Sequence, residues 1–131
     1  MAYQAGYEID TDPPSGRISF TFRGFWNEGD TARFSSDLAD ALGRMAAGGA
    51  RPGHYLGLID VREQAILSPE MVERFQAFAD GPGLLAQRTA VVVNGSLQAM
   101  QMRRIGHPPR YAFFRTMGEA LSWLERTRRA A

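Results

Sequence analysis

Ser68 and Pro69 place a hydroxyl group and a proline at the predicted start of a helix. A hydroxyl there can cap free backbone N–H groups, and proline fits the first helical position. The same N–H groups would also favour a phosphate on Ser68. Ser68 is therefore either a phosphorylation site or an ordinary helix cap.

A second polar stretch, Asn94, Gly95 and Ser96, lies between a predicted buried strand and a predicted helix. Proteins of the α/β class often bind ligands or anions at such a junction. One glycine is far fewer than a phosphate-binding loop requires, so the alternative is a plain turn. If a ligand site exists, this helix N-terminus and the one at Pro69 would both supply its polar donors.

Catalytic and metal-binding residues are few. Asp60 ends a predicted strand and could act as a base, but no nucleophile or second catalytic group is spaced to pair with it, so we expect a structural carboxylate. The chain has no cysteine, and its two histidines, His54 and His107, form no metal-ligand motif. The sequence therefore predicts no enzyme, no metal site and no cofactor.

Adjacent aromatic residues follow one predicted strand. Phe25 and Trp26 cannot both enter the core easily, so we expect one ring to reach the surface and anchor a partner. Alternatively, they help to line a cavity for an apolar ligand. The other members of that lining would be Phe75, Phe78, Met100 and Met102. The same spacing is equally typical of a filled core.

Composition indicates a globular protein. The 131 residues fit a single domain, with its core over about residues 7–124, and the net charge is +1. All 15 basic residues are arginine. Residues 1–80 hold 7 arginines and 12 acids, whereas residues 81–131 hold 8 arginines and 2 acids. We expect folding to interleave these halves and largely cancel the difference.

Partners and location follow from the same composition. The pI of 8.2 lies below the value of roughly 9 typical of nucleic-acid-binding domains, so no nucleic-acid partner is expected. Four arginines could in principle contact a nucleic acid, but we expect them to be solvated: Arg103, Arg104, Arg110 and Arg115. Neither a secretory signal nor a membrane-spanning apolar run is present in the sequence, which predicts a cytoplasmic, soluble protein.

Hydrophobic periodicity predicts the elements. A strand at residues 7–9, a turn at 12–16 and an alternating strand at 17–23 predict an antiparallel hairpin. Asp30 is expected to cap the next helix. The buried stripe of that helix is predicted to comprise Phe34, Leu38, Ala41, Leu42 and Met45.

Buried strands are predicted at 54–61 and 89–93, and a last strand at 111–114. A helix is expected to follow each of the three. Leu97 and Met100 are expected to face inward from the helix after Ser96. Leu121, Trp123 and Leu124 should supply the contacts of the last helix, which Thr116 caps. The order β-β-α-β-α-β-α-β-α predicts an α/β fold, with a mixed five-stranded sheet flanked by four helices.

This order resembles the STAS fold, and most closely the small bacterial SpoIIAA-like, or STAS/SEC14-type, proteins. The resemblance runs from Tyr7 to Leu124. The segments that carry it are Gly24-Phe25-Trp26, Ile59-Asp60-Val61, Leu67-Ser68-Pro69-Glu70, Thr89-Ala90-Val91-Val92-Val93 and Glu119-Ala120-Leu121-Ser122-Trp123-Leu124.

The resemblance implies two possible functions. Anti-sigma-factor antagonists of this fold bind a partner kinase, which phosphorylates a serine at the start of the second helix. Pro69 occupies that position here and Ser68 lies one residue earlier, which argues against an intact kinase switch. SEC14-like relatives instead hold lipid-like molecules.

The sequence therefore favours a non-catalytic regulatory or protein-protein interaction module, bound to a protein partner or forming a homodimer. Its expected surface comprises Phe25, Trp26, Ser68, Pro69, Asn94, Gly95 and Ser96. The alternative is a carrier of a lipid-like apolar small molecule.

Overall fold

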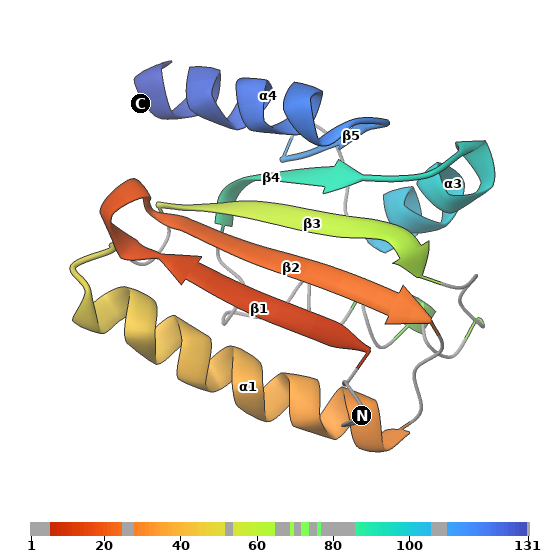
Figure 1. Ribbon diagram of the computed structural model, residues 1–131, viewed down its shortest axis with the longest axis horizontal. Coiled ribbons are helices and arrows are strands. Elements are labelled where there is room, and N and C mark those ends of the chain that lie inside the picture. Colours follow the sequence, from red (N-terminus) through yellow and green to blue (C-terminus); the bar gives the residue numbers. More distant parts are fainter. Residues whose placement is uncertain are drawn as a thin grey trace, which may run out of the picture.

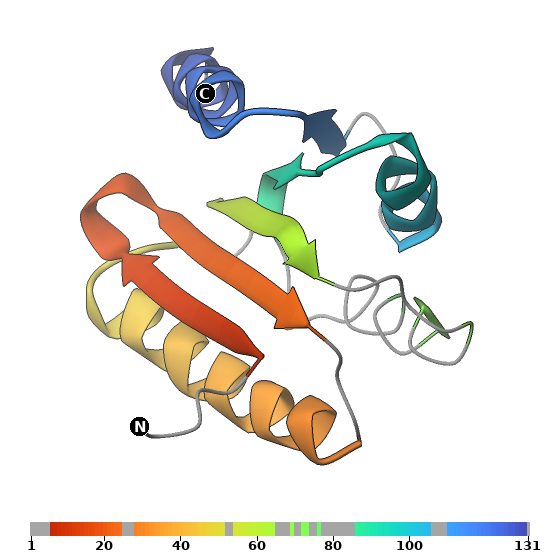
Figure 2. The same cartoon turned by 45° about the vertical axis from the view of Figure 1, so that its right-hand side comes forward.

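A computed structural model describes residues 6–24, 28–51, 54–64, 69, 72–73, 76, 86–105 and 110–130. The elements within these ranges are five strands and three α-helices, and the strands form one sheet (Figures 1 and 2). Their order in the sheet is their order in the chain, β1 to β5. The first and last strands therefore form opposite edges of the sheet.

The sheet opens with the predicted antiparallel hairpin. Strand β1 (Tyr7–Asp12) pairs with β2 (Arg17–Gly24). A short 3-10 turn, Pro13–Ser15, joins them. It ends at Gly16, whose φ of 71° lies in the left-handed region that glycine adopts without strain. The alternating residues of β2 thus bury Ile18, Phe20 and Phe22 on one face, as predicted.

The rest of the sheet is parallel. Strand β3 (Tyr55–Gln64) lies beside β2, β4 (Ala86–Val92) beside β3, and β5 (Tyr111–Phe114) beside β4. The mixed sheet is confirmed. Strand β3 continues three residues beyond its predicted end at Val61, and its last residue, Gln64, is again buried.

Helices cover both faces. Helices α1 (Glu28–Ala47) and α3 (Ser96–Ile105) contribute to one core cluster, and α4 (Met117–Ala130) contributes to the cluster on the other face (Figure 1). The predicted stripe of α1 is confirmed, with Leu42 only partly buried. Asp30 does not cap α1: the helix begins two residues earlier, and Asp30 is buried in its first turn against Arg33.

Helix α4 begins after the predicted cap. The hydroxyl oxygen of Thr116 accepts a hydrogen bond of 3.2 Å from the Glu119 N–H and donates one of 3.0 Å to the Glu119 carboxylate. Ala120 and Leu124 are the buried pair, whereas Leu121 is 36% exposed. The prediction that Leu121 packs inward is therefore wrong, because the buried stripe passes along the adjacent side of the helix.

The predicted helix after Ser68 lies mainly outside the described residues. Four described positions within it, Pro69, Val72, Glu73 and Gln76, have helical backbone. Val72 is buried in the same core cluster as α1 and α3. Among the described residues, three of the four expected helices are thus present as continuous elements.

One aromatic cluster holds α1 against the hairpin. The ring of Phe34 lies 5.3 Å from Tyr7, 5.4 Å from Phe22 and 5.8 Å from Phe20, each with edge-to-face geometry. Aromatic pairs in this arrangement add about 0.5–1.5 kcal/mol beyond the burial of their area. This cluster therefore anchors α1 to the β1–β2 half of the sheet.

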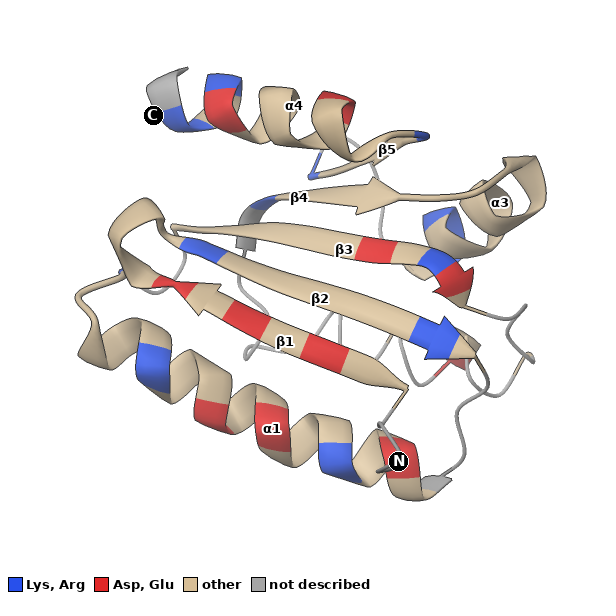
Figure 3. Ribbon diagram, viewed as in Figure 1, with Lys and Arg blue, Asp and Glu red and all other residues tan. Residues whose placement is uncertain are grey.

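Folding does not cancel the charge asymmetry of the sequence. Because the strands keep their chain order, the acidic and basic halves remain at opposite edges (Figure 3). Strand β1 carries Glu8, Asp10 and Asp12, all exposed, whereas α3 carries Arg103 and Arg104 and no acid. The expected interleaving of the two halves is wrong for this reason.

Candidate functional site

The turn between β4 and α3 is fastened to the end of β3. The Asn94 side-chain amide donates a hydrogen bond of 2.9 Å to the Arg62 carbonyl oxygen. The Asn94 backbone N–H donates one of 2.9 Å to the side-chain oxygen of Gln98. Asn94 therefore shapes the turn and directs its side chain towards β3.

Gln98 completes this attachment from within α3. Its side-chain nitrogen donates hydrogen bonds to the Val61 carbonyl oxygen and, at 3.2 Å, to the Gln64 carbonyl oxygen. The buried side of α3 consequently consists of Gln98, Met102 and Ile105, at spacings of four and three residues. Sequence reasoning missed Gln98, although its spacing from Met102 and Ile105 was a usable signal.

Because Gln98 lies on the buried side of α3, two large apolar side chains of this helix face outward. Leu97 is 55% exposed and Met100 is 57% exposed. The prediction that both face inward is wrong, because the amide of Gln98 occupies the core position. Met102, by contrast, is buried. Leu97 and Met100, three residues apart on a helix, lie on adjacent turns and form one apolar patch.

A groove with a volume of about 280 Å³ lies beside this patch, between α3 and the edge strand β5. Its lining residues are Val93, Gly95, Ser96, Ala99, Met100, Arg103, Phe113, Phe114 and Arg115. The groove thus brings together two of the predicted site residues, Gly95 and Ser96. We call this groove, together with Leu97, the α3–β5 surface.

The charged groups of the α3–β5 surface are all positive. Arg103 places its guanidinium carbon 5.5 Å from the centre of the Phe113 ring, and Arg115 lies at the end of β5. Arg104 is exposed on the next position of α3. None of these three guanidinium groups forms an ion pair within the described part of the chain. The surface therefore combines apolar side chains with uncompensated positive charge.

Asp60, the candidate base, is engaged by Arg62 on the other face of the sheet. Both carboxylate oxygens accept hydrogen bonds from the guanidinium, at 3.0 and 2.9 Å, and one also accepts the Arg62 backbone N–H at 3.1 Å. Partial burial opposes ionisation, but these bonds and the positive charge hold the pKa of Asp60 below its ordinary value. This ionised, bonded carboxylate serves to order the end of β3.

The remaining predicted site residues are distributed as follows. Pro69 is exposed and helical, and it does not line the α3–β5 groove. Gln76, in the same predicted helix, donates a hydrogen bond to the Arg104 carbonyl oxygen at the end of α3. The others lie outside the described residues: Phe25, Trp26, Ser68, Phe75 and Phe78.

No three residues of the metal-ligating types cluster within the described ranges. His54 is exposed, and His107 lies outside these ranges. Of the helices that the structure describes, none has the length and apolar character needed to cross a membrane.

Comparison with known proteins identifies the architecture. No family model matches the sequence, and no curated protein is similar enough in sequence to match. Among solved structures, an uncharacterised protein of the DUF3478 family with a SpoIIAA-like fold, from Shewanella loihica PV-4, superposes with a TM-score of 0.69. The match has 23% sequence identity and covers 95% of this chain and 98% of the other. The chain therefore has the SpoIIAA-like fold.

Proposed function

We propose that this chain, with its SpoIIAA-like fold, is a non-catalytic interaction module that binds a protein partner at the α3–β5 surface. The observation that carries the proposal is the exposure of Leu97 and Met100 beside arginines that form no ion pair with any residue that the structure describes. Large exposed apolar groups beside a groove are typical of interaction sites. The fold match supports the architecture alone, and the chemistry of the surface supports the choice of partner.

The charge of the surface defines the partner. Arg103 and Arg115 line the groove beside the apolar patch, so two copies meeting through this same surface would bring like charges together. Arg104, exposed on the same helix, adds to this positive charge. Such juxtaposition disfavours a symmetric homodimer here. The complementary occupant is a segment of another protein with acidic side chains flanking an apolar one.

Site-specific photo-crosslinking in the native cell tests this proposal. A benzophenone amino acid would replace Leu97, with Asp10, exposed on the opposite edge strand, as the matched control position. We expect position 97, and not position 10, to cross-link one protein through an acidic segment located by peptide mapping. Equal yields from both positions, or a cross-link from position 97 only to a second copy of this chain, would contradict the proposal.

A further inference from the structure

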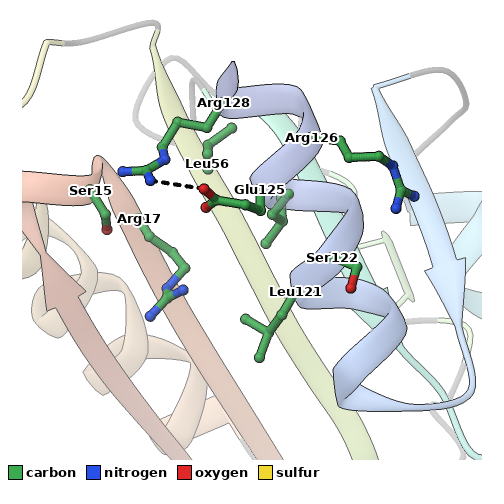
Figure 4. Close-up of a pocket in the computed structure, with 9 residues that line it drawn as sticks. Ser15, Arg17, Leu56, Leu121, Ser122, Glu125, Arg126 and Arg128 are labelled. Atoms are coloured by element: carbon green, nitrogen blue, oxygen red, sulfur yellow. Dashed lines mark hydrogen bonds and ion pairs between the residues drawn. The ribbon is translucent and has the colours of Figure 1, made fainter. Parts of the chain in front are cut away.

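An open groove of about 500 Å³ lies on the opposite face of the sheet from α3, between α4 and β2 (Figure 4). Residues from β2, β3 and α4 line it, among them Arg17, Leu56, Leu121, Leu124, Glu125 and Arg128. The groove exists because α4 packs over β3, β4 and β5 and leaves the β1–β2 side of this face uncovered (Figure 2).

The groove has an apolar interior. Leu56 of β3 and Leu124 of α4 are buried at its base. Leu121 extends from α4 towards the β2 side of the groove and is 36% exposed (Figure 4). An apolar group lying in the groove would cover the Leu121 side chain, which contributes favourable free energy through loss of water contact.

The groove also contains one positively charged side chain that no described acidic residue neutralises. Arg17 of β2 lies across from Leu121, half-buried, and its guanidinium forms no ion pair within the described part of the chain (Figure 4). At one end of the groove, Arg128 is already bound to Glu125 at 3.0 Å. Arg126 points to the far side of α4 (Figure 4). Arg17 is therefore the group available to an anion.

We propose that this groove binds a small amphiphile whose anionic head contacts Arg17 and whose apolar part lies on Leu56, Leu121 and Leu124. A guanidinium presents paired N–H donors that fit carboxylate and phosphate groups. The volume lies within the range of about 300–1,000 Å³ typical of small-molecule sites. This site uses residues other than those expected to line an apolar cavity, and it is independent of the α3–β5 surface.

Calorimetry and native mass spectrometry with defined amphiphiles test this inference. The probes are dodecanoate and dodecyl phosphate, with dodecyltrimethylammonium and butyrate as controls for head charge and chain length, all below micelle-forming concentrations. We expect one dodecanoate or dodecyl phosphate per chain and no saturable binding of either control. The tighter of the two anions identifies the preferred head group. Binding of the cation with equal affinity, or of many anions per chain, would overturn the inference.

Two variants with matched controls locate the binding. Arg17→Gln should lower the affinity for the anionic amphiphile by about tenfold, because a charge-assisted contact is lost. Arg103→Gln, on the other face, should leave the affinity unchanged. Leu121→Gln should also weaken binding, whereas Leu97→Gln should not. Circular dichroism confirms that each variant is folded, and unchanged affinity in folded Arg17→Gln and Leu121→Gln would place binding elsewhere and refute the site.

Discussion

The side-chain amide of Gln98 donates a hydrogen bond to the Val61 carbonyl oxygen, so a polar side chain fixes the first turn of α3 to the end of β3. The same amide donates a second hydrogen bond, to the Gln64 carbonyl oxygen, so α3 is attached to β3 at two points. This attachment sets the rotation of α3 about its axis. It thereby determines that Leu97 and Met100 face outward at the α3–β5 surface.

Replacing this amide should destabilise the protein. Gln98→Leu leaves buried backbone carbonyl oxygens without their donor, and we expect the free energy of unfolding to fall by about 1–3 kcal/mol in urea denaturation. Leu97→Ala, one position along the same helix but exposed, is the control and should change stability by less than about 0.5 kcal/mol. Equal effects of the two substitutions would show that Gln98 does not fix α3.

The outward orientation of the apolar patch gives a second prediction. The double variant Leu97→Ser, Met100→Ser should keep its unfolding free energy within about 1 kcal/mol of the original protein, because both side chains are exposed. Met102→Ala, on the buried side of the same helix, should cost about 2–5 kcal/mol. A loss of several kcal/mol in the double variant would mean that the patch belongs to the core.

Sequence reasoning predicted elements whose burial follows simple periodicity. The stripe of α1 from Phe34 to Met45 and the alternation of Ile18, Phe20 and Phe22 are both confirmed. It failed for α3 because the preference for apolar groups in the core was outweighed there by the hydrogen-bonding demand of the β3 carbonyl oxygens. Strand order is also set by tertiary packing, so the persistence of the charge asymmetry could not be predicted.

The candidate site was predictable only in part. Gly95 and Ser96 were identified from their position between a strand and a helix, and both line the groove. Phe113 and Arg115 join them only because β5 packs beside β4 and brings its side chains next to Arg103 of α3. Such contacts between distant segments leave no local pattern in the sequence.

Gly57 and Thr89 face each other on neighbouring strands and give a third prediction. A Cβ atom at Gly57 would lie 2.7 Å from the Thr89 hydroxyl oxygen, which is buried and has no hydrogen-bond partner among the described residues. Gly57→Ala should therefore destabilise the protein by about 1–3 kcal/mol. Thr89→Val should stabilise it by about 1 kcal/mol, because it removes the unpaired hydroxyl. Urea denaturation of both variants checks the signs, and a stabilising Gly57→Ala would contradict this packing.

Tyr7 gives a prediction at alkaline pH. Burial, a hydrogen bond to Asp37 and the negative charge of Asp37 raise the pKa of Tyr7 from 10.0 to about 12. The unfolded chain releases this proton more readily than the folded one. Its contribution to stability is therefore complete below pH 10 and is lost as the pH rises from about 10 to about 12.

Tyr7→Phe removes this titration while retaining the ring that contacts Phe34. Between pH 9 and pH 12, the unfolding free energy of the variant should decline less steeply than that of the original protein. Urea denaturation across this pH range, with ultraviolet detection of tyrosinate, provides the comparison. Parallel declines would show that the Tyr7 proton is not held more tightly in the folded state.

Charge reversal at the α3–β5 surface tests the proposed partner binding most directly. The yield of the cross-link from position 97 would be measured in an Arg103→Glu, Arg115→Glu variant and in an Arg44→Glu, Arg51→Glu control, whose arginines are exposed elsewhere. We predict a loss of at least about fivefold for the first variant, because an acidic partner would meet like charge, and no loss for the control. Equal yields from both folded variants would contradict recognition of an acidic partner by this surface.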